Sequence, residues 1–227
     1  VISSFLMLAF IFILYPRAEV SANRINEVLD TDSSILDGNI SKHNDVKGQI
    51  EFKHVSFKYP DSEEYMLEDI SFKAKKGDTV AFIGSTGSGK STLINLVPRF
   101  YDVTSGEILI DDINVKDYNL KTLHEKIGYV PQKAVIFNDS IMNNILYGDA
   151  GKKLTKEMGI EASKIAQADD FITKMEKEYN SHIASGGTNV SGGQKQRISI
   201  ARAIARKPEF YIFDDSFSAL DYKTDYI

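Results

Sequence analysis

The 227-residue chain has 42% hydrophobic residues, 26% charged residues and a net charge of −5. This composition suits one large domain with a core and excludes a disordered tail, a collagen-like chain and a disulfide scaffold. The lack of Cys excludes thiolate catalysis and Cys-based metal sites, and the negative charge supplies no general field for nucleic acid. Because the sequence begins with Val1 and stops at Ile227, we expect an interior part of a longer protein.

The first predicted element is an apolar helix over residues 1–15, VISSFLMLAFIFILY. Such a helix covers about 22 Å, less than the roughly 30 Å of a bilayer core. A signal peptide would need basic residues before this run, whereas Pro16-Arg17 follows it. A buried core helix is an alternative because of the short length. The end of a transmembrane helix fits best, with Arg17 and Arg24 on the cytoplasmic side.

The next stretch predicts a continuing helix and then a linker. Residues 18–29 carry an incomplete helical stripe of apolar side chains. Residues 30–48 are rich in Asp, Ser, Asn, Lys and Gly, which is typical of a linker. We therefore expect three parts: residues 1–16 as the C-terminal part of a transmembrane helix, 17–49 as a cytoplasmic helix extension and linker, and 50–227 as one domain.

Strand patterns begin at Ile50. Residues 50–60 alternate apolar and polar side chains, which predicts a strand with one exposed face. Residues 69–84 predict two further strands joined by a Lys-Gly-Asp turn. Strands and helices then alternate to the end, which favours an α/β layer fold.

A phosphate-binding motif, G-x-x-x-x-G-K-[ST], occupies residues 84–91 between an apolar strand (79–83) and a helix-like segment (90–99). Glycines let backbone N–H groups approach phosphate oxygens, and a helix N-terminus adds partial positive charge. Lys90 supplies a cation for the β- and γ-phosphates, and Ser91 Oγ can ligate Mg²⁺. The alternative is a Gly-rich turn that matches by chance. The predicted binding set is Gly84, Ser85, Thr86, Gly87, Ser88, Gly89, Lys90, Ser91 and Thr92.

A second acidic position ends the predicted strand Phe210–Phe213. Ligands of parallel sheets bind beyond the carboxyl ends of the strands, which places Asp214 near the phosphate-binding loop. Asp214 can then hold Mg²⁺ directly or through water, and Asp215 could orient or deprotonate an attacking water. The alternative is that both carboxylates cap the next turn.

A well-capped helix precedes that strand. Ser191 is a good N-cap for it, and the sequence Ser-Gly-Gly at this N-terminus is a second anion-binding device. A monomer that binds one nucleotide does not need two anion-binding positions. The alternative is therefore that Ser191 only caps the helix and binds no ligand. The basic residues of this helix are expected on its solvated face and at its dipole-matched end rather than on nucleic acid: Lys195, Arg197, Arg202, Arg206 and Lys207.

Together these motifs resemble the ATP-binding cassette (ABC) transporters, specifically exporters whose membrane and nucleotide-binding parts share one chain. Besides the phosphate-binding loop, VSGGQ at 190–194 is similar to the family's LSGGQ signature, and 210–214 is similar to the Walker B strand. Residues 129–132 (YVPQ) look like the Q-loop, and 218–221 (SALD) look like the D-loop. The runs that resemble the exporter subgroup are 98–132 and 136–148.

The resemblance implies an α/β P-loop NTPase of ABC type, with a mixed sheet core, an antiparallel β subdomain and a helical signature subdomain. It implies ATP and Mg²⁺ as cofactors, with each ATP held between the phosphate-binding loop of one subunit and the signature helix of a second. The implied nucleotide contacts beyond the loop are Tyr59 on adenine and Ser191, Gly192, Gly193 and Gln194. The implied Mg²⁺ ligands are Ser91, Gln132 and Asp214, and the implied catalytic residues are Lys90, Gln132 and Asp215.

The resemblance also implies a place in the cell. ATP binding would close the dimer and move membrane helices through Gln132 and the residues after it, and Asp221 would communicate across the dimer. The expected partners are a second ABC subunit, this protein's own transmembrane domain and the membrane, with no nucleic acid. The expected location is the cell membrane, multi-pass, with the nucleotide-binding domain in the cytoplasm.

Three departures from the family pattern matter. Asp215 stands where the family has a Glu base, and a shortfall of about 1 Å can cost roughly a hundredfold. Residues 184–187 (ASGG) replace the usual Glu-Arg, and the sequence ends before the expected switch histidine. We therefore favour the slow-site half of a heterodimeric exporter over a slow homodimer.

Two other functions compete with a transport ATPase. A non-hydrolysing ATP-binding module that gates a partner differs from it mainly at Asp215. A soluble ABC ATPase of DNA repair or translation is disfavoured by the apolar leader and by the exporter-like run 98–132.

Overall fold

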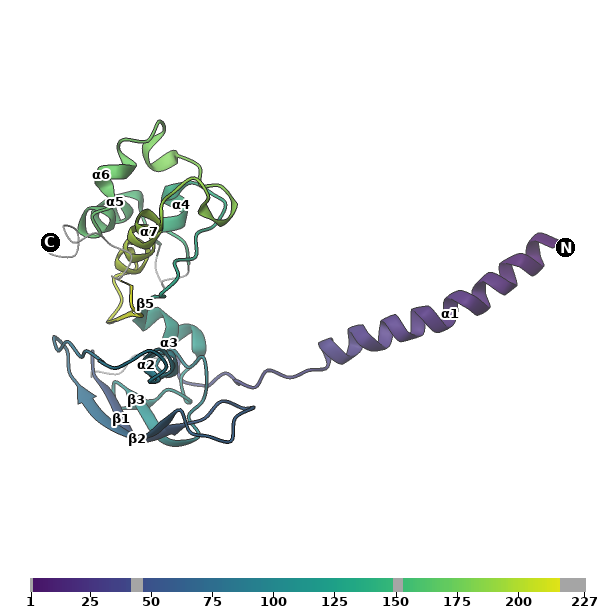
Figure 1. Cartoon of the computed structure of the whole chain (residues 1–227), viewed down its shortest axis with the longest axis horizontal. Coiled ribbons are helices and arrows are strands. Elements are labelled where there is room, and N and C mark those ends of the chain that lie inside the picture. Colours follow the sequence, from purple (N-terminus) through teal and green to yellow (C-terminus); the bar gives the residue numbers. More distant parts are fainter. Residues whose placement is uncertain (1, 42–46, 149–152, 217–227) are drawn as a thin grey trace. The chain divides into compact units, whose positions relative to one another are not determined.

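The computed structural model consists of two units, Val1–Leu36 and Asp37–Ile227. Residues 2–41, 47–148 and 153–216 are described. Helix α1 (Ile2–Leu29) runs through the first unit without interruption, with Pro16 inside it and no buried side chain (Figure 1). Its predicted continuation through residues 18–29 is therefore confirmed.

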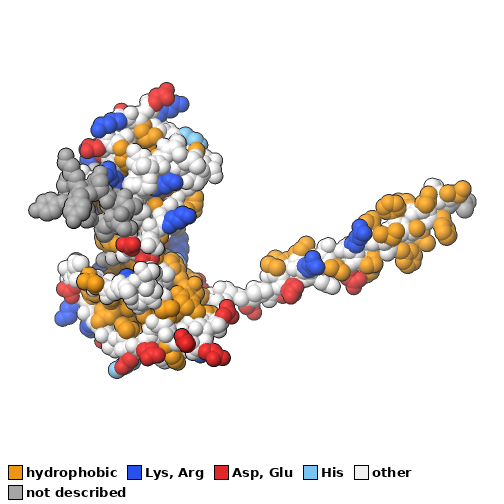
Figure 2. All heavy atoms as spheres, in the orientation of Figure 1, with side chains coloured by type: hydrophobic (Ala, Val, Ile, Leu, Met, Phe, Trp, Pro, Cys, Tyr) orange, Lys and Arg blue, Asp and Glu red, His pale blue; other side chains and the backbone are white. Residues whose placement is uncertain are grey.

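Helix α1 has two chemically different ends. Hydrophobic side chains surround its N-terminal part, whereas charged side chains occur only in its C-terminal half (Figure 2). By length and composition alone it could cross a membrane, and it is the one helix of the described residues that meets this test. At 28 residues it covers about 42 Å.

The second unit begins with a four-stranded antiparallel sheet of order β2-β1-β3-β4. Its strands are β1 (Ile50–Phe57), β2 (Leu67–Ala74), β3 (Ser105–Ile110) and β4 (Ile113–Asn114). Phe52, Val55 and Phe57 of β1 are almost fully buried, and the register shifts between Phe52 and Val55. The strand predicted over 50–60 is confirmed, with an irregularity that the simple alternation did not show.

Two helices and a parallel strand pair share the core of this sheet. The helices are α2 (Lys90–Leu96) and α3 (Leu120–Lys126), and the strands are β5 (Ile127–Val130) and β6 (Phe210–Phe213). Figure 1 shows α2 and α3 beside the antiparallel sheet. The buried side chains of this cluster include Phe52, Phe57, Leu93, Leu96, Ile108, Leu123 and Ile127.

A second hydrophobic cluster is helical. It contains α4 (Ile141–Ile145), α5 (Lys156–Ile165), α6 (Asp169–Ile172) and α7 (Gly192–Ala205), with short 3₁₀ turns at Glu178–Asn180 and Ser185–Gly187. Its buried members include Ile141, Ile145, Ile172, Ile183, Ile198 and Ala201. The predicted α/β class with an antiparallel sheet and a helical region is confirmed.

One predicted element is wrong. Thr79–Ile83 forms no strand, and Ile83 is 97% exposed. A strand needs a hydrogen-bonded neighbour, and within the described residues β6 pairs only with β5. Residues 79–82 instead line one cleft together with the four residues of β6.

The predicted solvated face of α7 is wrong at three positions, although Arg202 does lie in the last turn of the helix as predicted. Arg197 donates through Nη1 to Gln167 O at 3.4 Å. Arg202 donates through Nε to Asn144 O at 2.7 Å and through Nη1 to Val135 O at 2.9 Å. Arg206 donates through Nη2 to His124 O at 2.9 Å. These three guanidinium groups therefore bind backbone carbonyls, because Arg presents several planar donors that can satisfy partly buried acceptors.

A buried ion pair fixes the beginning of β6. Lys126 Nζ donates to Asp111 Oδ2 at 2.7 Å and to Glu209 Oε2 at 2.9 Å, and Glu209 N donates to Lys126 O at 2.9 Å. Lys126 and Asp111 are almost fully buried. Glu209 immediately precedes β6, so α3 and the antiparallel sheet hold this strand by its first residues.

Burial of three tyrosines leads to a prediction for alkaline pH. Burial is the main cause that raises the pKa of Tyr118, Tyr129 and Tyr179 to about 12. Since the folded-state pKa exceeds the ordinary value near 10, their contribution to stability is complete below pH 10 and is lost as the pH rises through about 12. We expect the free energy of unfolding to fall in that interval. Absorbance titration of tyrosinate should show a late-ionising group, and ionisation of all tyrosines near pH 10 in a still folded chain would contradict this.

Candidate functional site

The phosphate-binding loop depends on two glycines with left-handed backbone conformations. Gly89 caps the N-terminus of α2 with φ 86°, and Gly87 has φ 83°. A Cβ atom at Gly89 would lie 2.9 Å from Leu67 Cδ2 and 3.2 Å from Met66 O. Both backbone conformation and space therefore require glycine at the entry to α2.

Lys90 lies inside this loop. Its Nζ donates to Gly84 O and to Ser85 O, each at 2.7 Å, and approaches Ser88 Oγ at 3.4 Å. The ammonium group is therefore held by the loop that it follows in sequence. This places a positive charge where the loop glycines allow an anion to approach the backbone.

The next residue connects the loop to the end of β6. Ser91 Oγ donates to Asp214 Oδ1 at 2.7 Å, across 123 positions of sequence. Asp214 follows β6 directly, and its backbone N donates to Val130 O at 3.0 Å. The predicted meeting of phosphate-binding loop and acidic strand end is present in the structure.

A second contact lies beside the first. Gln132 Nε2 donates to Asp215 Oδ2 at 3.2 Å. The parallel register pairs Val130 with Phe213, so the residues two positions beyond each strand emerge side by side. Asp215 has φ 45°, a conformation that Asp tolerates better than most side chains. Both strand ends therefore present polar side chains at the same edge.

A cleft of about 1140 Å³ gathers most of the predicted residues. Its lining includes Gly84, Thr86, Gly87, Ser88, Gly89, Lys90, Ser91, Thr92, Gln132, Asp214 and Asp215. Ser85 contributes its carbonyl to Lys90 without lining the cleft. This volume is slightly larger than the roughly 300–1,000 Å³ of typical small-molecule sites.

Tyr59 lies outside the cleft lining but is connected to it. Its hydroxyl lies 2.9 Å from Thr92 Oγ1 on α2. Its ring makes edge contacts with Phe57 and Tyr101, at centroid distances of 5.0 Å and 5.3 Å. The structure thus places this aromatic side chain next to the phosphate-binding helix, and its role towards adenine stays a prediction.

The predicted N-cap of the signature helix is confirmed. Ser191 Oγ accepts from Gln194 N at 3.2 Å, and Gln194 Oε1 accepts from Ser191 N at 2.9 Å, which makes a capping box. Gly192 and Gly193 are the first residues of α7. None of Ser191–Gln194 lines the cleft, so the structure keeps the two anion-binding devices apart.

We expect Ser191→Ala to lower the free energy of unfolding by about 1 kcal/mol, because it removes the side-chain acceptor of the capping box. Urea denaturation followed by circular dichroism measures this. A Ser191→Asp variant retains an acceptor and should be close to the parent. Equal stability of the alanine variant and the parent would show that the cap contributes nothing.

The donor chemistry fits a hard cation. Ser91 and Asp214 supply oxygen donors in contact, and Gln132 adds a carboxamide oxygen at the neighbouring position. Within the described residues, no group of three or more His, Cys, Asp or Glu side chains is arranged to hold a metal ion. The D-loop residue Asp221 lies outside the described residues.

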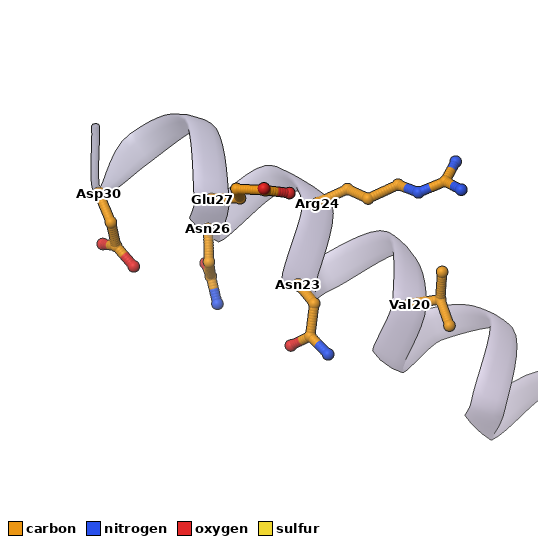
Figure 3. Close-up of a pocket in the computed structure, with 6 residues that line it drawn as sticks. All are labelled: Val20, Asn23, Arg24, Asn26, Glu27 and Asp30. Atoms are coloured by element: carbon orange, nitrogen blue, oxygen red, sulfur yellow. The ribbon is translucent and has the colours of Figure 1, made fainter.

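Another hollow lies on the C-terminal half of α1 (Figure 3). Its lining consists of Val20, Asn23, Arg24, Asn26, Glu27 and Asp30. Their spacing places them along one side of a single exposed helix, and Figure 3 shows their side chains extending from it. Within the described chain, only α1 and the residue that follows it line this hollow.

Sequence reasoning missed one pair near the cleft. Tyr129 Oη donates to Asn95 Oδ1 at 2.8 Å. Asn95 lies four residues after Ser91 on α2, and Tyr129 lies three residues before Gln132. The spacing of four along α2 was the available signal, because it places two polar side chains on one helix face.

Comparisons with known proteins agree with this geometry. The ABC transporter family model matches residues 67–218. An uncharacterised ABC transporter ATP-binding protein of Bacillus subtilis is 44% identical over 96% of this chain and 38% of its own length. A Staphylococcus aureus protein named for multidrug export, with ATP-binding and permease parts, is 45% identical over 88% of this chain and 35% of its own length.

A solved structure leads to the same family. A bacterial Atm1-family ABC exporter with ATP bound superposes with a TM-score of 0.87 and 32% identity, over 97% of this chain and 38% of that one. The chain thus spans well under half the length of these relatives. With a family model covering most of its second unit and relatives matching nearly its whole length, the chain belongs to the ABC transporter family and has the nucleotide-binding fold of that family.

Proposed function

We propose that this chain is the ATP-binding and ATP-hydrolysing part of an ABC exporter. Members of the family are ATPases coupled to transport. The observation that carries the proposal is the 2.7 Å contact between Ser91 Oγ and Asp214 Oδ1, since it joins the phosphate-binding loop to the acidic strand end. Lys90 and the Gln132–Asp215 pair border the same cleft.

The residues of the cleft have separate tasks in this proposal. Lys90 exchanges the carbonyls of Gly84 and Ser85 for phosphate oxygens, which satisfies an ammonium group better than neutral carbonyls do. Loop amides orient the phosphates. Mg²⁺, held by Ser91 with Gln132 and Asp214, would neutralise charge on the β- and γ-phosphates. Tyr59 contacts the adenine from outside the loop.

Asp215 is the proposed general base. Its Oδ2 accepts from Gln132 Nε2, so the amide orients the carboxylate towards the cleft. A base must lie within about 3.2 Å of the water that it deprotonates. Asp is one methylene shorter than Glu, and this gives slow turnover at this chain's own site.

The proposed surroundings are a membrane and a second subunit. Helix α1 is long and apolar enough to cross a bilayer, which supports a membrane location with the second unit in the cytoplasm. Residues 1–16 then end a transmembrane helix, 17–49 connect it, and 50–227 form the nucleotide-binding domain. The separation of Ser191–Gln194 from the cleft is consistent with their use on the ATP of a partner.

A second candidate function rests on Asp215 alone. With a weak base, this chain would bind ATP and gate a catalytically competent partner in a heterodimer. Its intact Ser191 capping box would then complete the active site of that partner.

Steady-state phosphate release by the full-length protein alone, in liposomes, separates these functions. Slow or absent turnover alone, with high turnover on addition of a partner subunit, supports the heterodimer. Rapid turnover without any partner that is lost in Asp215→Ala would rule the heterodimer out.

A further inference from the structure

The ATP site of the proposed function rests on a ring of hydrogen bonds that links three elements. Ser91 Oγ on α2 donates to Asp214 Oδ1 after β6. Asp214 N donates to Val130 O at 3.0 Å, the last residue of β5. Tyr129 precedes Val130, and its hydroxyl returns to α2 through Asn95 Oδ1 at 2.8 Å. The ring therefore begins at Ser91 and returns to Asn95, and both residues belong to α2.

The spacing of Ser91 and Asn95 along α2 determines which strand ends this helix contacts. Ser91 and Asn95 are four residues apart, so their side chains lie one above the other on the face that meets the strands. The two contacts on this face bind neighbouring parallel strands, since β5 and β6 pair from Ile127–Phe210 to Val130–Phe213. A shift of α2 relative to β5 would therefore also move Ser91 relative to Asp214.

The surroundings of Tyr129 suit a fixed donor. Its ring makes an edge contact with Phe100 at a centroid distance of 5.6 Å. Burial, with the nearby Asp214 carboxylate as a smaller cause, raises the pKa of Tyr129 to about 12.

We propose that Tyr129 is a positioning residue for the cation-binding pair Ser91–Asp214, which it aligns by anchoring Asn95 and hence α2 against β5. Tyr129 does not touch the nucleotide in this role. If Ser91 Oγ turned from Asp214 towards a bound cation, the hydrogen bond between Tyr129 and Asn95 would still join α2 to β5. This inference rests on the proposed function as far as the cation is concerned.

Tyr129→Phe removes only the hydroxyl and tests the role. We expect Tyr129→Phe to lower the ATP affinity of the full chain about threefold to tenfold when Mg²⁺ is present, which is the loss expected for one hydrogen bond. In EDTA the affinity should fall less than about twofold. Amide hydrogen exchange of α2 should accelerate in the nucleotide-free and metal-free chain. Asn95→Leu should behave alike, and Tyr129→Phe with Asn95→Leu should be no worse than either alone.

Tyr179→Phe is the matched control. Tyr179 Oη also donates a single hydrogen bond, to Asp169 Oδ1 at 2.6 Å, but it belongs to the helical cluster. The Tyr179→Phe variant should lower the free energy of unfolding about as much as Tyr129→Phe does. It should leave the ratio of the ATP affinities in Mg²⁺ and in EDTA unchanged.

Two results would overturn the inference. One is an equal loss of affinity with and without Mg²⁺ in Tyr129→Phe, and the other is unchanged exchange at α2. If the parent chain bound no ATP at all, the proposed function would fail, whereas the exchange experiment would still decide whether Tyr129 and Asn95 hold α2.

Discussion

Replacing Lys90 with alanine is expected to lower the ATP affinity of the chain by about a hundredfold or more. Removing one partner of a desolvated charge pair costs about 2–5 kcal/mol, and each 1.4 kcal/mol is a factor of ten. In the structure Nζ is bonded to Gly84 O and Ser85 O, so the ammonium is already inside the loop that would receive the phosphates. Isothermal titration of ATP with Mg²⁺ measures the change.

Lys53→Ala is the control for this prediction, because it removes the same charge from an exposed pair with Glu107 on the antiparallel sheet. Its ATP affinity should equal that of the parent. Circular dichroism should show both variants folded. Retained affinity in Lys90→Ala would mean that the phosphates bind elsewhere.

Lengthening Asp215 to Glu is expected to raise turnover of the full-length protein by up to about a hundredfold. A positional shortfall of about 1 Å can cost that much, and a general base contributes about 10²- to 10⁴-fold. A Glu side chain would extend farther beyond the end of β6 than that of Asp215, whose Oδ2 now accepts from Gln132 Nε2 at 3.2 Å. Phosphate release at saturating ATP measures the gain.

Asp215→Asn completes this test, since it keeps the size of the side chain and removes the base. It should abolish the remaining turnover while ATP affinity stays close to that of the parent. If Asp215→Glu left turnover unchanged with ATP bound, the base would not be the slow element of this site.

The motif-bearing parts of the fold were predictable because local chemistry determines them. Ser191 followed by two glycines and Gln194 contains the capping box in four consecutive residues. The position of Asp214 near the phosphate-binding loop was predictable from the strand that precedes it, because the carboxyl ends of parallel strands meet at a common edge of the sheet. The structure adds the partner, Ser91, across 123 positions of sequence.

The parts that sequence reasoning missed depend on neighbours distant in sequence. The run Thr79–Ile83 has the apolar composition of a strand. A strand also needs a hydrogen-bonded neighbour, and within the described residues β6 pairs only with β5. Arg202 has the pattern of a solvated helix end, yet its acceptors, Asn144 O and Val135 O, come from segments about 60 residues earlier. Pairwise tertiary contacts of this kind leave no periodic signal in the chain.

ATP affinity in Mg²⁺ for four proteins tests most directly whether the loop and the acidic strand end form one site. The proteins are the chain in detergent, Ser91→Ala, Asp214→Asn and the double variant. We predict saturable binding of one ATP by the parent, weaker binding by each single variant, and little further loss in the double variant, because contacting residues are not additive. Additive losses, or no binding by a folded parent chain, would contradict a single nucleotide site built on Ser91 and Asp214.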